Sequence, residues 1–428
     1  MASKESLTII ERLAPFAGAA ATNPLGVFRE IARVTVDAAA RQRRALDTFQ
    51  THDDTVIEPG NEAWLLNALH SPVPFEFRDA EIDEFKEWFY DTTDERWLKW
   101  RLLTGGPGRG KTRFVHEWIK QLEGENSGTV IGGFVNANTI AANPDALSGF
   151  LDVKEDVIFA VDYAERFRDV VAWLLHASIA MRNGLKKNRE RRIRVVLISR
   201  KQTETWDGLR VDYPMIERFL SSLAGGLETV PLSPIAEALQ DRQTAFDAAF
   251  RAFDEHLRHI WREGKPTPLP SPRPDFSDTS FEDALLIHLA ALAIWHEGEG
   301  IEPISRDSLL RWLLDRERRA WNRCLDDRRM DSVLKPHPIE QAAVLLTFVS
   351  LGGQGIQDRS RAIELLGTCP LLAGETPATI SAIADIFREL YPGPAWVNGV
   401  TPDLLGQYLL AIADDEFLDA FDDATDEN

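Results

Sequence analysis

One stretch decides the fold of this chain: Gly105-Gly106-Pro107-Gly108-Arg109-Gly110-Lys111-Thr112, a complete phosphate-binding loop of the form G-x-x-x-x-G-K-[ST]. The run 97–103 before it favours a strand, and Arg113 opens a predicted helix over 113–122. Glycines let backbone N–H groups close around phosphates, and the helix N-terminus adds its positive end. Lys111 would reach the outer phosphates, and the Thr112 hydroxyl would ligate Mg²⁺. The loop therefore predicts a nucleoside triphosphate site.

Composition is that of a globular protein and argues against several classes. The 428 residues are 44% hydrophobic and 27% charged, which suits two to four domains with buried cores. The two cysteines, Cys324 and Cys369, cannot form a disulfide framework, which fits a reducing cytoplasm. No apolar run approaches the roughly 20 residues of a membrane span. We expect a cytoplasmic protein without a membrane partner.

Net charge bears on the kind of partner. The formal charge is −20, which argues against broad binding to nucleic acid. Residues 401–428 carry nine Asp and Glu and no Lys or Arg, so this tail is strongly acidic. The opposite run, residues 186–192, could touch a polyanion, but it also lies where a solvated loop must precede a strand.

The order of elements predicts an α/β domain of the P-loop NTPase type. Residues 1–60 favour a separate helical segment of unknown role, with a polar linker at 51–60. From residue 61 to 235, predicted strands and helices alternate, as in a parallel sheet with flanking helices. The strands after the loop are expected at 129–135, 156–161, 194–198 and 228–232, and the run 156–161 is apolar enough to be buried on both faces.

Beyond Pro234 the sequence is helical almost throughout. We expect a helical lid over 236–325 and a winged-helix-like domain with the acidic tail over 326–428. The predicted helices span 236–259, 283–296, 308–324, 339–351, 360–366, 377–390 and 402–413. Thr376 is a candidate N-cap followed by Pro377 at the first helical position. Three helices before the turn region 391–400 suggest the winged helix.

Three residues at strand ends narrow the chemistry of the loop. Asp162 ends an apolar strand and would hold Mg²⁺ through water beside Thr112, unless it caps the turn. Glu165 could orient an attacking water, or pair on the surface with Arg166 or a neighbouring arginine. Arg200 ends the next strand and could sense the γ-phosphate, or pair with one of these two acids.

These motifs together resemble the STAND class of signalling ATPases, which contains the NACHT and NB-ARC proteins. The resemblance rests on the loop, the strand into Asp162-Tyr163-Ala164-Glu165, and the strand into Ser199-Arg200. It implies that Glu165 is the hydrolytic acid and Arg200 the sensor arginine. Two further segments, LLIHLAALA at 285–293 and Leu-Tyr-Pro at 390–392, resemble a bacterial subgroup of the class. The resemblance covers roughly residues 61–412, and class members usually continue into a repeat array that senses the trigger.

A segment upstream of the loop extends the resemblance. Residues 74–81, PFEFRDAE, resemble the Phe-x-Gly-Arg-x-x-Glu box that packs near the adenine in the class. The box places Phe75 and Arg78 among the residues that would bind the nucleotide, and Phe77 stands where the class has glycine. The Gly-x-Pro motif through which a class lid contacts the nucleotide has two imperfect counterparts here, 230–232 and the helix that begins near Leu285.

The leading hypothesis is an ATP-dependent switch with slow hydrolysis. ADP would hold the lid and winged helix closed, and ATP sensed by Arg200 would open them for self-association. By analogy with the class, the process is signalling, such as bacterial antiviral defence, with a protein trigger or effector that the sequence does not identify.

Two rival hypotheses come from other classes. One is a DNA-associated winged-helix ATPase of the loader or origin-recognition type, which the charge opposes. The other is a small-molecule phosphotransferase whose lid arginines clamp phosphates. The candidates for that clamp are Arg311, Arg316, Arg318 and Arg319, although the same segment also reads as a simple amphipathic helix.

Overall fold

The computed structural model describes Phe49 and most of residues 62–413. The longest internal gap is 201–227, and shorter gaps include 92–97, 141–146, 185–190 and 262–266. Several sequence predictions lie outside the described residues: the N-terminal helical segment apart from Phe49, the linker 51–60, most of the cationic run, and the acidic tail after residue 413.

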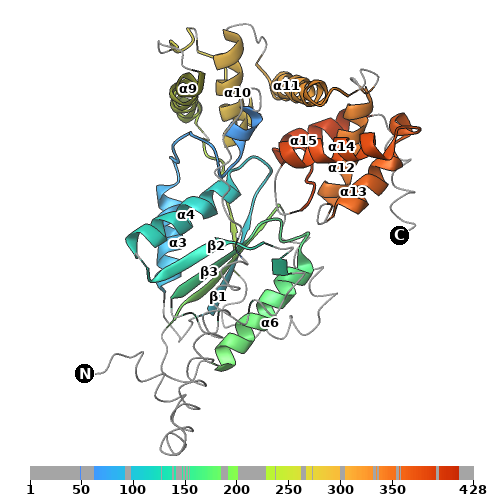
Figure 1. Ribbon diagram of the computed structural model, residues 1–428. Helices are drawn as coiled ribbons and strands as arrows, with labels where there is room; N and C mark the ends of the chain where they lie inside the picture. The colour runs from blue at the N-terminus through green and yellow to red at the C-terminus, as the bar shows by residue number, and fades with distance from the viewer. Residues whose placement is uncertain are drawn as a thin grey trace, which may run out of the picture.

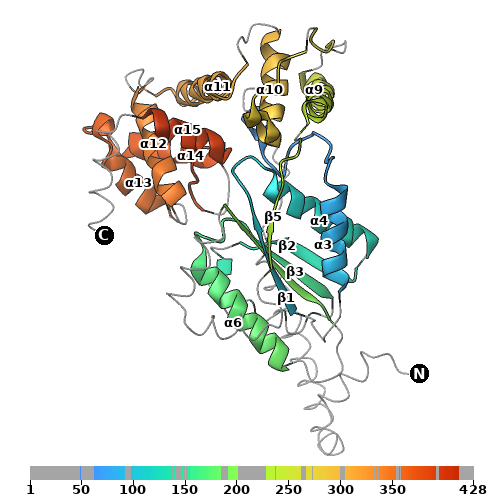
Figure 2. The same ribbon diagram turned by 180° about the vertical axis from the view of Figure 1, so that it is seen from behind.

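A five-stranded parallel sheet carries the phosphate-binding loop (Figures 1 and 2). Its strands are β1 (Leu98–Thr104), β2 (Val130–Phe134), β3 (Asp156–Val161), β4 (Ile193–Ser199) and β5 (Glu228–Pro231). The order across the sheet is β2-β3-β4-β1-β5, and all neighbours are parallel. The predicted parallel α/β sheet is thus confirmed. Because β4 lies between β1 and β3, its end stands between the phosphate-binding loop and Asp162.

Helices cover both faces of the sheet, which explains the continuous apolar runs of its central strands. Helices α3 (Asp79–Tyr90) and α4 (Lys111–Glu125) pack on one face, and α6 (Arg168–Gly184) packs on the other (Figures 1 and 2). Along β4, Val195 and Leu197 face the α6 side, while Val196 and Ile198 face α3 and α4. A strand with two buried faces favours apolar residues along most of its length.

At the edge strand β2, two glycines allow neighbouring side chains to pack directly against the backbone. A Cβ atom on Gly132 would lie 2.7 Å from Cγ2 of Ile119 in α4, and one on Gly133 would lie 2.9 Å from Cγ of Phe49. Phe49 also forms an antiparallel bridge with Val135 and packs against the sheet core. The N-terminal segment, predicted to be separate, therefore places at least this residue against the sheet.

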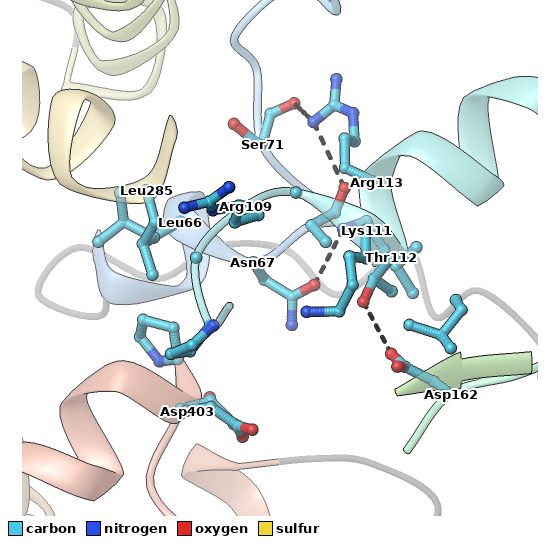
Figure 3. A pocket seen from close by; sticks show the side chains of 18 of the residues that line it. Leu66, Asn67, Ser71, Arg109, Lys111, Thr112, Arg113, Asp162, Leu285 and Asp403 are labelled. Atoms are coloured by element: carbon cyan, nitrogen blue, oxygen red, sulfur yellow. Dashed lines mark hydrogen bonds between the residues drawn. The ribbon is translucent and has the colours of Figure 1, made fainter. Parts of the chain in front are cut away.

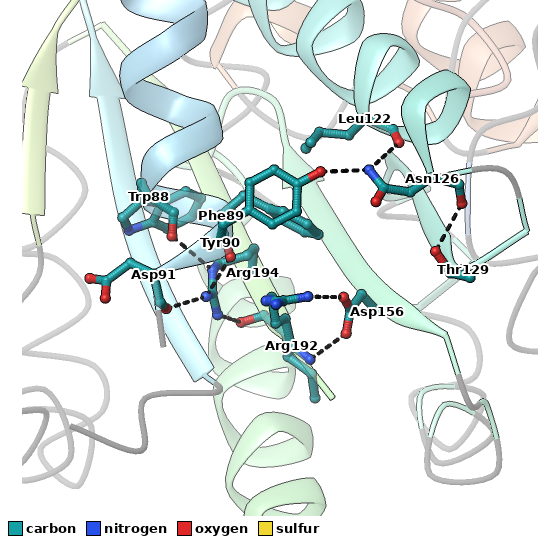
Figure 4. Close-up of polar contacts among 11 residues, drawn as sticks. Trp88, Phe89, Tyr90, Asp91, Leu122, Asn126, Thr129, Asp156, Arg192 and Arg194 are labelled. Atoms are coloured by element: carbon teal, nitrogen blue, oxygen red, sulfur yellow. Dashed lines mark hydrogen bonds and ion pairs between the residues drawn. The ribbon is translucent and has the colours of Figure 1, made fainter. Parts of the chain in front are cut away.

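Helix α3 is an element that the sequence analysis did not predict, and a buried arginine holds its end. The guanidinium of Arg194 in β4 donates to the carbonyls of Trp88 (3.3 Å), Phe89 (2.7 Å) and Asp91 (3.0 Å) (Figure 4). Burial lowers the pKa of Arg194 to about 10, so the side chain is charged at neutral pH. A cation at this position satisfies the last carbonyls of the helix and matches its dipole.

The second half of the chain is helical, as predicted. It contains α9 (Leu239–Trp261), α10 (Ala284–Glu297), α11 (Arg306–Asp327), α12 (His337–Gly352), α13 (Arg359–Gly367), α14 (Pro377–Leu390) and α15 (Asp403–Ile412). These bounds lie within a few residues of the predicted ones. The Thr376 hydroxyl accepts from the N–H of Thr379 (3.2 Å), so the predicted N-cap is confirmed. At α11, Ser305 forms a capping box with Ser308 that the sequence analysis missed.

Helices α12, α13 and α14 follow one another as the three helices of a winged helix do. In the part of the chain that the structure describes, a single antiparallel bridge stands where a winged helix has its small sheet. Ile356, between α12 and α13, pairs antiparallel with Val397, which follows α14, through N···O distances of 3.2 and 3.0 Å. One apolar core runs through these helices and the helices of the expected lid, and it also includes the 3-10 helix η2 (Glu62–Leu66). The boundaries expected at residues 235 and 325 stay predictions.

Among the described residues, no helix combines the length and the apolar character needed to cross a membrane.

Candidate functional site

A cavity of about 620 Å³ opens over the phosphate-binding loop (Figure 3). It is lined by residues 107–113 of the loop and α4, by much of the segment 63–78, by the ends of β3 and β4, by the start of α10, and by residues 350–351 and 398–404 of the C-terminal helices. Gly105 and Gly106 are not in the lining. The parts of the chain that meet here are far apart in sequence, so the cavity is a junction between the sheet and both helical parts.

The loop has the conformation that its glycines were expected to allow. Gly110 adopts φ 82° as the N-cap of α4, and Gly108 adopts the same angle, a region that favours glycine. The Nζ atom of Lys111 donates to the carbonyl oxygens of Gly105 (2.7 Å) and Gly106 (2.9 Å). Burial lowers the pKa of Lys111, while the charges of nearby acids oppose this shift. The ammonium group is thus held at the loop, within the same turn that would receive a phosphate.

The two residues expected to hold Mg²⁺ lie together. The Oγ1 atom of Thr112 donates to Oδ2 of Asp162 (2.8 Å), and the N–H of Tyr163 donates to Oδ1 of the same carboxylate (3.0 Å). Burial raises the pKa of Asp162 to about 6, although Thr112 and Lys111 act in the opposite direction. One hydroxyl and one carboxylate suit Mg²⁺, which prefers oxygen and keeps several of its waters. The donor set therefore fits magnesium.

Glu165 lines the same cavity, in the turn after Asp162. Its Oε2 atom is buried and has no hydrogen-bond partner among the described residues. The alternative partner Arg166 is engaged elsewhere, because its guanidinium lies 4.4 Å from the centroid of the Tyr163 ring and donates to the carbonyl of Ser350 (3.4 Å). A buried acceptor without a donor can receive a hydrogen bond from a water molecule.

Arg200 is held by a residue that the sequence analysis did not consider. Its Nη2 atom donates to Oδ2 of Asp403 at the start of α15 (2.6 Å). The neighbouring Gln407 offers its amide oxygen to the same guanidinium. Asp403 also lies 3.9 Å from Arg166. The expected alternative, an ion pair of Arg200 with Asp162 or Glu165, is replaced by a contact between the end of β4 and the C-terminal helices.

Arg78 holds the backbone of the phosphate-binding loop through hydrogen bonds. Its guanidinium is buried and donates to the carbonyls of Ser233 (2.7 Å) and Arg109 (3.3 Å), and it forms an ion pair with Glu81 (2.6 Å). These contacts fix the loop backbone, and Arg78 also lines the cavity, so its expected contact with the nucleotide stays a prediction. Phe77, which replaces a glycine of the resembled box, adopts φ 63°, so the chain retains the backbone conformation that favours glycine.

The other residues predicted to bind the nucleotide divide into two groups. Phe75 lines the cavity with its ring near that of Phe114 (centroids 6.4 Å apart). The side chains of Arg109 and Arg113 also line it but are bound to protein. Arg109 pairs with Asp283 (3.0 Å), and Arg113 donates to the carbonyls of Ala68, Ser71 and Val73 at 3.0–3.4 Å. These two arginines fasten the lid and the segment 68–73 to the loop.

The proposed phosphate clamp in the lid does not reach the cavity. None of Arg311, Arg316, Arg318 and Arg319 lines it. Arg318 bridges Glu340 and Asp315, and Arg316 lies 3.8 Å from Glu297. Of the two candidate lid contacts, Leu285 lines the cavity and residues 230–232 do not. The expected lid also contributes Ala245, Ala248 and His288, which no motif had marked as ligand contacts.

The site defines the class of protein: the chain has the fold of a P-loop nucleoside triphosphatase, with the loop between β1 and α4 and an acid at the end of β3. No protein-family model matches this chain, and no curated protein sequence does. The fold is similar to that of an Aeropyrum pernix ORC2 protein in ADPNP-ADP complexes, at 14% identity and a TM-score of 0.39, over 90% of this chain and 99% of that one.

Two similar structures contain DNA. An Aeropyrum pernix ORC1 protein in complex with DNA has 14% identity and a TM-score of 0.37, over 85% of this chain and 100% of that chain. A Drosophila ORC structure bound to DNA has 12% identity and a TM-score of 0.32, over 88% and 100%.

Proposed function

We propose that this chain is an ATP-binding and slowly hydrolysing molecular switch of the STAND kind. The observation that carries the proposal is the ion pair between Arg200 and Asp403, which joins the end of β4 to the C-terminal helices across the cavity. The pair lies on the side of the cavity that also holds Lys111, Thr112 and Asp162. A phosphate in the loop would therefore change the surroundings of the pair.

The charges predict how the nucleotide would act on this pair. Lys111 and the loop N–H groups would bind the β-phosphate, and Thr112 with Asp162 would hold Mg²⁺, which supplies charge neutralisation at the phosphates. With ADP, Arg200 keeps Asp403 as its partner and the C-terminal helices stay closed. The γ-phosphate of ATP would compete for Arg200 and leave Asp403 facing an anion. The same phosphate therefore weakens the closed form twice, through a lost attraction and a new repulsion.

Hydrolysis would reset the switch. The free Oε2 atom of Glu165 supports a role in orienting a water molecule for attack on the γ-phosphate. Loss of the γ-phosphate would return Arg200 to Asp403. In the open form we expect an exposed surface for self-association, with a protein trigger and effector, and antiviral defence remains the process suggested by the resemblance.

Light scattering tests the switch directly. We expect the wild-type protein with Mg²⁺ and a non-hydrolysable ATP analogue to form particles of higher mass than the same protein with ADP. Lys111→Ala serves as the control, because it should bind neither nucleotide and show a single mass. Tight binding of both nucleotides without any difference in mass would contradict the proposal.

A second candidate is a DNA-associated ATPase, and the arrangement of α12–α14 with the Ile356–Val397 bridge is the observation that favours it. Winged helices commonly place a helix in a DNA groove, whereas the net charge of −20 opposes contact with phosphates. Filter binding of duplex DNA across a salt series separates the two candidates. A steep fall in affinity with salt favours the DNA-associated ATPase, and no binding at low salt excludes it.

A further inference from the structure

His288 is a half-buried titratable residue that the phosphate chemistry leaves unused. It lies on α10, one turn after Leu285, whose backbone N–H donates to the carbonyl of Gly108 in the phosphate-binding loop (3.2 Å). His288 lines the cavity, and among the described residues neither of its ring nitrogens has a hydrogen-bond partner. The ring nitrogens are therefore available to a ligand or to water in the cavity.

His288 lines the cavity from α10, whereas Asp162 and Glu165 line it from the end of β3. Lys111, Asp162, Glu165, Arg200 and Asp403 form one electrostatic group around the loop. Among the described residues, the charged side chain that influences the pKa of His288 is Arg113, which fastens the segment 68–73. Burial, together with that positive charge, lowers the pKa of His288 to about 4. At neutral pH the ring is therefore uncharged and offers one donor and one acceptor.

The walls around His288 have the composition of a base-binding slot. The cavity has many apolar lining residues, and η2 and α9, which contribute some of them, pack against α10. These residues are Leu66, Leu69, Phe75, Ile235, Ala245, Ala248 and Leu285. Asn67 adds a second polar group. Its Oδ1 atom accepts from the N–H of Leu69 (3.0 Å), which directs the amide NH₂ elsewhere, and Figure 3 shows the side chain projecting into the cavity. Apolar walls with a few placed polar groups are typical of sites that bind a flat heterocycle.

We propose that His288 is the residue that recognises the nucleobase, through a hydrogen bond from its neutral imidazole to the polar edge of the base, with the Asn67 amide as a second donor. The inference rests on the proposed nucleotide binding and adds to it the source of base selectivity. Phosphate contacts alone cannot distinguish one base from another, whereas a fixed donor and acceptor on a rigid helix can.

The test compares a probe that has a base with one that does not. His288→Phe keeps a ring of similar size and removes both nitrogens, and His288→Gln keeps hydrogen-bonding capacity. Calorimetry should show that His288→Phe weakens ADP binding by about fivefold, the size of one neutral hydrogen bond, and leaves binding of inorganic tripolyphosphate unchanged. The affinity ratios among ATP, GTP and CTP should move toward one. His288→Gln should retain part of the selectivity.

A matched control lies on the same helix. His296 does not line the cavity, so His296→Phe should change neither probe. Equal weakening of ADP and tripolyphosphate in His288→Phe, or unchanged ratios among the three nucleotides, would overturn the role of His288. If the wild-type protein binds neither ADP nor tripolyphosphate, the proposed nucleotide site itself fails. The two failures are thus distinguishable.

Discussion

At the scale of single residues, Glu165 carries the most direct test of hydrolysis. Its buried Oε2 atom can accept a hydrogen bond from the attacking water, and an amide at the same position cannot act as a base. We expect Glu165→Gln to bind ATP as tightly as the wild type and to hydrolyse it about tenfold or more slowly, measured as phosphate release in single-turnover experiments. Glu364→Gln, on the distant helix α13, is the control. Unchanged turnover in Glu165→Gln would remove this residue from the mechanism.

The neutral state of His288 predicts a pH dependence of stability. Its pKa is about 4 in the folded protein and near 6.5 when exposed, so the unfolded chain takes up the proton first as the pH falls. The free energy of unfolding should therefore decrease between pH 6.5 and 4 and lose this dependence below pH 4. In His288→Phe the decrease should be smaller. Urea denaturation of both proteins at pH 7.5 and pH 5 measures the difference, and equal losses would show that His288 titrates normally.

The sequence predicts the position of a site residue where a local motif determines it, and not where a distant part of the chain does. Lys111, Thr112 and Asp162 were predicted from spacing alone, because the loop and the strand end fix their positions, and the structure brings them together. Arg78 was identified by its box and lines the cavity, but its contacts with the carbonyls of Arg109 and Ser233 could not be predicted, because a motif does not specify such distant partners. Asp403 could not be found, because its partner Arg200 is 203 residues away.

At the scale of elements, amphipathic and fully apolar segments were predictable, and α3 was not. The sequence of α3, DAEIDEFKEWFY, buries Ile82, Phe85, Trp88 and Phe89, and its first residues overlap the box at 74–81. The strand order was also beyond prediction, because apolar runs identify buried strands without stating their neighbours. The N-cap at Thr376 was predictable because Pro377 marks the first helical position, whereas the cap at Ser305, which has no such proline, was missed.

The contact of Arg194 with the end of α3 gives a prediction for that element. Substituting Arg194 by Leu removes the donor to three carbonyl groups and leaves them buried without partners. We expect Arg194→Leu to lower the free energy of unfolding by about 3 kcal/mol in urea titration. Arg361→Leu, at a half-exposed pair with Glu364 on α13, should change it by less than about 1 kcal/mol. Similar losses in both variants would show that the Arg194 contacts contribute little.

At the scale of the whole molecule, α11 and the C-terminal helices form one body. The Trp321 Nε1 atom in α11 donates to the hydroxyl of Tyr391 (2.7 Å), and this hydroxyl donates to the buried carboxylate of Glu317. Tyr391 belongs to the Leu-Tyr-Pro segment that the sequence singled out, so the motif has a structural role at the junction of α14 with α11. The same helices share one apolar core. An opening motion would therefore leave this junction intact and separate α15 from the end of β4.

The Arg200–Asp403 ion pair joins α15 to the end of β4, so removing it should favour the open form. Both side chains are about a quarter exposed, so the pair contributes about 1 kcal/mol to the closed form, or roughly a fivefold change in the ratio of closed to open molecules. Asp403→Ala should therefore raise the radius of gyration of the ADP-bound protein in small-angle X-ray scattering, toward the value of the ATP-bound wild type. Asp385→Ala removes a similar ion pair, with Arg359, on α14 and away from the sheet, and should leave the radius unchanged. If the ADP-bound Asp403→Ala protein keeps the wild-type radius, the C-terminal helices are held closed by the remaining contacts, and the γ-phosphate cannot open them through Arg200.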